Sequence, residues 1–195
     1  MINSVGSGLF ELPVTTLSEY ACCPKRFLFR FVEGHPDLGE GVACASQVGT
    51  LVHSALERGI RDANTLARFA EGSVSREWVE EAIMLAQRFN QDAAFALFHE
   101  ALASREQAVT LTVEQLRLNG VVDLVGNDRV LNFKTDQEVT PQHHRFQLWA
   151  YAWALARQKA HIAYLRHNQL HTFDATELEI ASQEVQTLVQ GIFFF

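Results

Sequence analysis

Three side chains near the middle of the sequence have the types and the spacing for hydrolysis assisted by a metal ion. Asp123 follows an apolar run, and a second short run contains Asn132-Phe133-Lys134. Alternate residues of a strand share one face, so Asn132 and Lys134 are predicted to point to the same side, away from Phe133. An acid, a second oxygen ligand and a lysine that meet at two strand ends could hold a divalent cation and stabilise negative charge beside it.

The elements that must position these groups follow from the hydrophobic pattern. Strands are predicted at about 107–118, 120–126, 129–134, 161–166 and 169–173. Helices are predicted at about 16–32, capped by Thr16 or Ser18 and interrupted by Pro24, at 46–61, and at 75–103 as one long helix or two stacked helices with Ser75 as cap. Two more are predicted, one from Pro141 to about Lys159 and one that starts at Asp174 or Thr176. The turn between the two central strands is assigned to Gly126-Asn127-Asp128. This order of elements predicts an α/β domain with a mixed central sheet.

The helix predicted from Pro141 has one polar face. His143, Gln147 and Tyr151 are spaced four residues apart, so they share that face. An apolar stripe that includes Trp149 and Trp153 is predicted to hold the opposite face on the sheet. Gln147 and Tyr151 are therefore expected to face the central strands.

Composition limits the class of protein. The chain has 195 residues, of which 48% are hydrophobic and 20% charged, as expected for one globular domain with a buried core. No stretch approaches the roughly 20 apolar residues that cross a bilayer, and the N-terminus does not resemble a signal peptide, so a cytoplasmic location is expected. The net charge of −7 argues against a free-standing, high-affinity nucleic-acid binder, but not against a nuclease domain held by a larger host protein.

Two small groups of residues leave alternatives open. Lys25, Arg26 and Arg30 form a compact basic group, which is either a solvated helix face or a phosphate contact. Three cysteines, Cys22, Cys23 and Cys44, lack the paired spacing of a zinc site and are interpreted as reduced thiols.

Four segments in a fixed order carry a resemblance to a known family. They are LSEYACCPKRFLF, GTLVHSALE, NGVVDLV with NFKT, and QLWAYAWAL. Over about residues 13–175 they resemble the RecB-like branch of the PD-(D/E)XK nuclease superfamily, most closely the nuclease domain at the C-terminus of UvrD/RecB/AddA-type helicase-nucleases. The resemblance implies a restriction-endonuclease-like α/β core with a mixed central β-sheet flanked by α-helices. It also implies that residues 1–195 form a single domain of a longer helicase-nuclease chain.

The same resemblance implies a role for each matched residue. The implied metal ligands are His53, Asp123, Asn132 and the backbone carbonyl of Phe133, the implied catalytic residues are Asp123, Asn132 and Lys134, and the implied substrate-binding residues are Thr135, Gln147 and Tyr151. A family glutamate matches Glu106, with Glu114 as the alternative. The implied cofactor is Mg²⁺, with Mn²⁺ as a substitute, and the implied partners are DNA, as single-stranded ends, and a helicase domain or subunit, with no membrane. Iron–sulfur members carry a C-terminal cysteine triplet, and since no cysteine follows Cys44, no cluster is expected.

Asn132 departs from the family pattern, which has Asp or Glu at this position. An amide keeps the shape of a carboxylate but loses its charge, so it is a poorer ligand for Mg²⁺. The residue is either natural or a deliberate change that traps an uncleaved complex. Two functions are therefore considered. The first is a Mg²⁺-dependent deoxyribonuclease, either an exonuclease or an endonuclease, that acts in DNA recombination and repair and is weakened or inactivated by Asn132. The alternative is a catalytically inactive module that binds DNA or braces a subunit.

Overall fold

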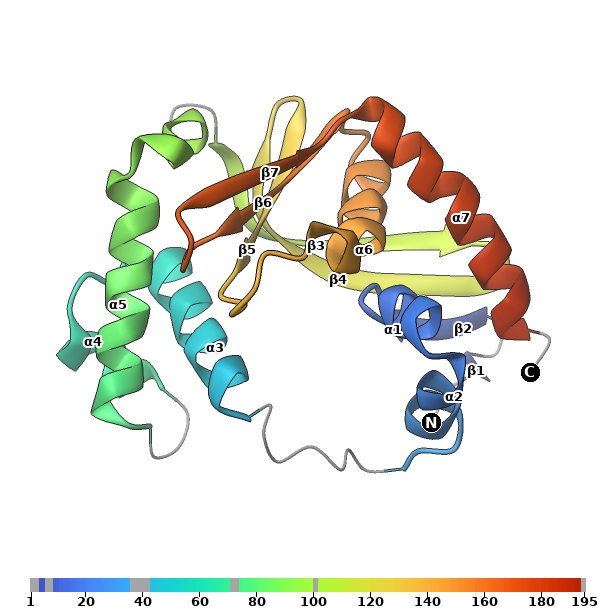
Figure 1. Cartoon of the computed structure of the whole chain (residues 1–195), viewed down its shortest axis with the longest axis horizontal. Helices are drawn as coiled ribbons and strands as arrows, with labels where there is room; N and C mark the ends of the chain where they lie inside the picture. The colour runs from blue at the N-terminus through green and yellow to red at the C-terminus, as the bar shows by residue number, and fades with distance from the viewer. Residues whose placement is uncertain (1–3, 6–8, 36–42, 71–73, 100–101, 194–195) are drawn as a thin grey trace.

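A mixed β-sheet lies between two layers of helices in the computed structural model, which describes residues 4–5, 9–35, 43–70, 74–99 and 102–193 (Figure 1). The seven strands are β1 (Ser4–Val5), β2 (Leu9–Pro13), β3 (Leu102–Val113), β4 (Leu116–Gly126), β5 (Arg129–Lys134), β6 (Lys159–Tyr164) and β7 (Gln169–Phe173). The helices are α1 (Thr16–Cys22), α2 (Pro24–Phe27), a π-helix (Leu28–Val32), α3 (Ala43–Arg58), α4 (Ala63–Phe69), α5 (Arg76–Gln91), a 3₁₀-helix (Ala93–Phe98), α6 (Pro141–Ala154) and α7 (Ala175–Phe193). The predicted mixed α/β architecture is confirmed.

The sheet mixes parallel and antiparallel pairs. Its order is β1-β2-β4-β5-β6-β7, and β3 pairs with β4 along the whole length of that strand. Pairing is parallel for β2–β4 and β5–β6, and antiparallel for β1–β2, β3–β4, β4–β5 and β6–β7. Because β3 occupies one edge of β4, β2 and β5 must share the other edge.

This shared edge of β4 contains a break. β2 pairs with residues up to Asn119, and β5 pairs only with Leu124 and Val125. Among the described strands, none pairs with residues 120–123 on that edge, so two neighbouring strands diverge here. A polar site can be built in such a gap because the backbone groups of the strand are not consumed by a ladder.

Gly120 lies in this break, and it is required there by packing. A Cβ atom at this position would lie 2.7 Å from Cε1 of Tyr151, since α6 crosses directly over the strand. The boundary predicted between two strands at 118–120 is wrong. The structure shows one continuous strand instead, and the hairpin turns at Glu114 and Gln115, where Glu114 has a positive φ of 53°.

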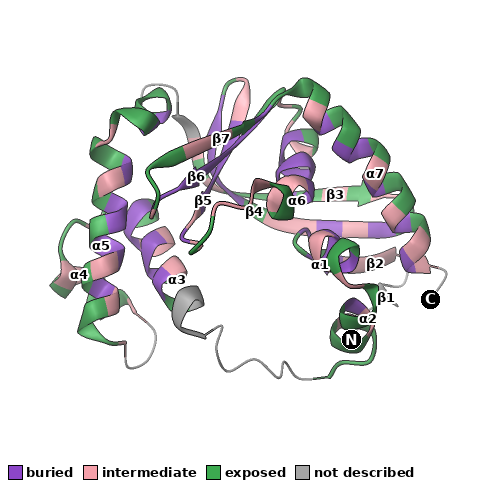
Figure 2. Ribbon diagram, viewed as in Figure 1, coloured by how far each residue is buried: buried purple, intermediate pink, exposed green. Residues whose placement is uncertain are grey.

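The two helical layers are held by separate apolar clusters. In α3, Val48, Leu51, Val52, Ala55 and Leu56 recur at helical spacing, and all are buried with α5 against β4, β5 and β6. On the other face, α1, α6 and α7 pack on the sheet around Leu118, Val122 and Leu148. Figure 2 shows the buried residues along the faces of α3, α5 and α6 and over β4 and β5.

Several predicted boundaries are wrong for local reasons. Of the one long or two stacked helices expected at 75–103, the structure has two, because Asp92 follows the end of α5 at Gln91, accepts from Ala94 N and starts the 3₁₀-helix. The second helix ends at Phe98, and residues 102 and 103 already belong to β3. The helix from Pro141 ends at Ala154, and Lys159 begins β6. Thr16 is not a cap, since its hydroxyl donates backwards to the carbonyl of Pro13 at 2.6 Å. Ser75 is confirmed as a cap, accepting from Trp78 N.

Other features of the helices were missed or misplaced by the sequence patterns. β2 and α4 were not predicted, and both are short elements. Trp149 packs in the core, but Trp153 is 57% exposed and does not hold α6 on the sheet. Phe193 packs on Phe10 with 5.4 Å between ring centroids, while Phe194 and Phe195 lie outside the described residues.

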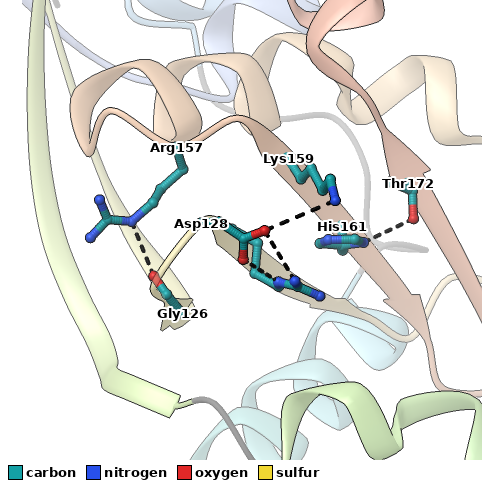
Figure 3. A network of polar contacts seen from close by, with 7 residues as sticks. Gly126, Asp128, Arg157, Lys159, His161 and Thr172 are labelled. Carbon is teal, nitrogen blue, oxygen red and sulfur yellow. Dashed lines mark hydrogen bonds and ion pairs between the residues drawn. The ribbon is translucent and has the colours of Figure 1, made fainter.

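Polar contacts tie the β4–β5 turn to the link between α6 and β6 (Figure 3). Arg157 Nε donates to the carbonyl of Gly126 at 3.0 Å, and Gln158 N donates to the carbonyl of Asp128 at 3.1 Å. The Asp128 carboxylate accepts two hydrogen bonds from Arg129 and lies 3.9 Å from Lys159 Nζ. None of the described helices is long and apolar enough to cross a membrane.

Candidate metal-binding site

His53 and Asp123 meet at the break in the sheet edge. His53 Nδ1 lies 2.9 Å from Asp123 Oδ1, and the Asp123 side chain is only 4% exposed. His53 borders the apolar stripe of α3, which holds the ring at the sheet. Four residues earlier, a Cβ atom at Gly49 would lie 3.2 Å from Thr135 Oγ1, so the absence of a side chain lets α3 approach the end of β5 closely. The histidine and the aspartate predicted as ligands are thus brought together.

The second oxygen of Asp123 joins β4 to β5. Phe133 N donates to Asp123 Oδ2 at 2.5 Å, across the point where the ladder between the two strands has ended. The side chain of Phe133 packs in the apolar cluster under α3 and α5. Phe133 therefore contributes its backbone to the site, and Asp123 is oriented from both sides.

Glu106 completes a cluster of three possible ligands. One ligand atom from each of His53, Glu106 and Asp123 lies within 4.8 Å of the others. Glu106 is on β3, opposite Asp123 in the register of the hairpin, and its φ of 47° lies in the left-handed region, which costs free energy for a residue with a side chain. Glu114, the alternative match, is exposed in the hairpin turn and is not in the cluster.

The titration of these groups reflects their crowding. Burial, followed by the negative charge of Asp123, raises the pKa of Glu106 to about 7. Burial alone would lower the pKa of His53, but the hydrogen bond to Asp123 and its charge outweigh burial and raise that pKa. A cation favours the charged form of a carboxyl group such as Glu106, which retains its proton near neutrality, so the charges favour a metal at this position.

The side chain of Asn132 offers a further oxygen atom that could bind a cation. Its side chain is 4% exposed, and Oδ1 is buried without a hydrogen-bond partner among the described residues. A buried amide oxygen without a partner is costly, and oxygen ligands are what Mg²⁺ and Mn²⁺ bind. The imidazole and two carboxylates of the cluster therefore fit a divalent cation, and the Asn132 amide oxygen is a further candidate ligand from β5.

Lys134 is held by a chain of hydrogen bonds from α6. Lys134 Nζ donates to Gln147 Oε1 at 3.0 Å, and Gln147 Nε2 donates to the Tyr151 hydroxyl at 2.9 Å. That hydroxyl is bonded to the backbone of Val121, within the unpaired edge of β4. Burial lowers the pKa of Lys134, with Asp123 and Asp136 offsetting part of the effect, and burial raises the pKa of Tyr151 to about 12.

The face that α6 turns toward the strands differs in part from the prediction. His143 was expected to share the face of Gln147, but it is exposed, and His144 takes that place with Nε2 2.7 Å from Asp136 Oδ2. An α-helix has 3.6 residues per turn, so residues spaced three and then four apart, such as 144, 147 and 151, stay on one face. Residues spaced four apart throughout, such as 143, 147 and 151, move gradually around the helix axis. Thr135 is buried between β5 and α3, and its role in substrate binding stays a prediction, as do those of Gln147 and Tyr151.

Sequence reasoning left Glu106 out of the ligand set, and no periodic pattern marks it. It stands just before the strand expected at 107–118, and its left-handed backbone leaves no trace in the sequence. The resemblance to the family glutamate was the sole signal.

The fold and the site together define a restriction-endonuclease-like domain with a candidate metal centre at a break in its sheet. A family model described as the PD-(D/E)XK nuclease superfamily matches residues 11–193. The chain belongs to this superfamily.

Comparison with solved structures agrees with this fold. The crystal structure of a proposed exonuclease from Eubacterium rectale superposes with a TM-score of 0.69 at 13% identity, covering 94% of this chain and 80% of that one. The structure of SSO0001 has a TM-score of 0.40 at 15% identity, covering 91% of this chain and 76% of that one. A search of curated proteins finds no match.

Proposed function

We propose that this domain is a divalent-metal-dependent deoxyribonuclease. The observation that carries the proposal is the convergence of His53, Glu106 and Asp123. The neighbouring strand β5 adds the Asn132 amide oxygen, which is buried without a hydrogen-bond partner among the described residues, and the half-buried Lys134. A bound Mg²⁺ or Mn²⁺ would neutralise charge on the scissile phosphate and lower the pKa of a water molecule. His53, Glu106, Asp123 and Asn132 would hold the ion.

The protein groups around the ion have separable roles. Lys134 would donate to a phosphate oxygen or to the attacking water, stabilising the negative charge that grows as one P–O bond forms and the other breaks. Gln147 fixes the position of the ammonium group, and Tyr151 fixes Gln147. Asp123 orients His53 and the backbone of β5. The site thus positions its charges before substrate binds.

The wider setting is proposed from the motifs alone. Their resemblance to helicase-nucleases supports a domain that acts on single-stranded DNA ends, beside a helicase domain or subunit, in recombination and repair. The superposition on a proposed exonuclease supports the fold of such an enzyme.

The test is to restore the acid and follow cleavage. Asn132→Asp and Asn132→Asp/Lys134→Ala are incubated with linear single-stranded DNA and Mg²⁺ or Mn²⁺. We expect cleavage by the first variant and a loss of about 10²–10³-fold in the second, the usual effect of removing one stabilising donor. No cleavage by Asn132→Asp with either metal would reject the enzyme.

A non-catalytic module remains the competing function, and Asn132 is the observation that favours it. Calorimetry with Mg²⁺ and Mn²⁺ separates the two. If neither the chain with Asn132 nor Asn132→Asp takes up metal, the module is preferred.

A further inference from the structure

The short helical segment after α1 alternates basic and aromatic side chains. Residues 24–32 read PKRFLFRFV, and Pro24 occupies the first turn of α2. Phe27 is buried and anchors the segment, packing on Tyr20 at 5.2 Å and on Phe31 at 5.3 Å between ring centroids. With these rings turned inward, the remaining side chains lie outward.

The outward face carries an aromatic ring bordered by positive charge. Phe29 is 40% exposed, and Lys25 Nζ lies 5.8 Å from the centroid of its ring. His35 meets the same ring edge-on at 5.7 Å. Arg26 is exposed on the neighbouring position. A half-exposed ring with a lysine over it suits a ligand that has both an aromatic face and an anionic backbone.

The charge distribution singles out this segment. The chain has a net charge of −7 and 16 lysines and arginines, of which three lie within residues 25–30. Arg30 pairs with Glu19 at 2.7 Å, whereas Lys25 and Arg26 have no ion-pair partner among the described residues. Two cations are thus left for a ligand, and they lie next to the exposed ring.

The segment is joined to the candidate metal site through α1. Val14 N donates to the carbonyl of Asn119 at 2.9 Å, at the end of β2 and the edge of the break in β4. From there α1 runs seven residues to α2, a rise of about 10 Å. Figure 1 shows α1 leading from the sheet to α2. A single strand bound at the metal site and running along α1 would lead toward Phe29.

We propose that Lys25, Arg26 and Phe29 form an auxiliary contact for single-stranded nucleic acid, with a base stacked on Phe29 and backbone phosphates at Lys25 and Arg26. Stacking on an aromatic ring beside cations is the usual way in which single strands are bound without sequence preference. The choice of ligand rests on the proposed nuclease function. A protein partner is less favoured because Phe29 and Val32, the exposed large apolar side chains of this segment, are separated by Arg30 and by Phe31, which packs inward.

Fluorescence anisotropy with a labelled oligothymidylate, in EDTA and over a series of salt concentrations, tests this contact. Phe29→Ala should weaken binding about tenfold at every salt concentration, because stacking carries no charge. Lys25→Ala and Arg26→Ala should each reduce the slope of log K against log salt by about 0.7, the value for one phosphate of a single strand. Arg76→Ala, an exposed arginine on α5, is the charge control, and Val32→Ala is the apolar control.

Several outcomes would overturn the contact. One is the absence of measurable binding by the wild-type chain. Another is equal affinity and slope in Phe29→Ala, Lys25→Ala and the two controls. If Phe29→Ala and Val32→Ala instead change only the oligomeric state in sedimentation, the face docks protein. Because the binding assay contains no metal, its result does not depend on cleavage. If the protein binds the strand here but Asn132→Asp cleaves no DNA in the separate test with metal, the proposed enzyme is rejected and this contact stands.

Discussion

The charged side chains at the two ends of β5 are arranged in opposite ways, paired at one end and crowded with like charge at the other. At the turn end, Asp128 is paired with Arg129 and Lys159, and Arg157 caps the carbonyl of Gly126 (Figure 3). At the other end, Asp123 and Glu106 crowd around His53, the Asn132 amide oxygen has no hydrogen-bond partner among the described residues, and the half-buried Lys134 donates to the Gln147 amide.

The difference separates structure from chemistry. Paired charges at an exposed turn tie two connections together and leave little free energy to release on binding a ligand. Carboxylates held close to each other are destabilising until a cation arrives, so the site end stores the potential for binding. Substitutions at the two ends should therefore affect different measurements.

The largest expected effect is on metal affinity at the site end. Asp123→Asn keeps the shape and can still accept from Phe133 N, but it removes the charge closest to the ion. We expect Mn²⁺ affinity to fall by about 100-fold or more, about 2.7 kcal/mol. Titration calorimetry measures it, and Asp128→Asn at the turn end is the matched control, with no change expected. A similar loss of Mn²⁺ affinity in both variants would show that the two ends of β5 do not differ in metal binding.

A second effect is acid sensitivity near the turn end. Burial lowers the pKa of His161 to about 4, below its unfolded value of 6.5, so the unfolded state binds a proton first as pH falls. Stability from this group is full above pH 6.5 and is lost between 6.5 and 4, at most about 2 kcal/mol at pH 5.

Urea unfolding at pH 7 and pH 5 tests this dependence. His161→Asn can keep a bond to Thr172, whose hydroxyl lies 2.9 Å from Nδ1 of the ring, and it should flatten the acid branch. His143→Asn, an exposed histidine, should leave it as in the wild type. An unchanged acid branch in His161→Asn would refute the assignment.

The third effect concerns the choice of metal. With Asn132, the chain should bind Mn²⁺ detectably and Mg²⁺ poorly, because imidazole suits Mn²⁺ better and the site lacks a charge. Asn132→Asp should gain Mg²⁺ affinity by about tenfold or more, about 1.4 kcal/mol. Equal Mg²⁺ affinity in the two forms would mean that residue 132 is not a ligand.

A fourth effect is a loss of stability without a loss of metal binding. Arg157→Ala removes the hydrogen bond to Gly126 and should lower the free energy of unfolding by about 1 kcal/mol. Chemical denaturation measures the change, and Mn²⁺ affinity should stay as it is in the wild type. A weakened metal site in this variant would show that the two ends of β5 are coupled.

The smallest effect should have the opposite sign to that of His161. The pKa of Glu106, raised to about 7, exceeds its unfolded value of 4.5, so its contribution to stability is full below pH 4.5 and is lost as pH rises to 7. Glu106→Gln should therefore gain stability over the wild type at pH 8 without metal, more than at pH 4.5. Saturating Mn²⁺ should reverse the order. A gain that is independent of pH would point to packing instead.

Local patterns in the sequence predicted much of the scaffold. The alternation in Asn132-Phe133-Lys134 put Phe133 in one apolar cluster and Lys134 toward α6, as the structure confirms. The stripe of α3 and the turn at Gly126-Asn127-Asp128 were equally local, and both are confirmed. Such features succeed because the periods of 2 and 3.6 residues are set by the backbone itself.

The sequence by itself determined which residue types could do chemistry and, on β5 and α3, which face of the element they occupy. Only the tertiary structure decided that Glu106 joins His53 and Asp123, that His144 rather than His143 faces the strands, and that β4 has an unpaired edge at Gly120. These three outcomes depend on the register between β3 and β4, on the rotation of α6 about its axis, and on where β2 and β5 stop pairing. Each is set by contacts between residues distant in sequence, so no local pattern encodes it.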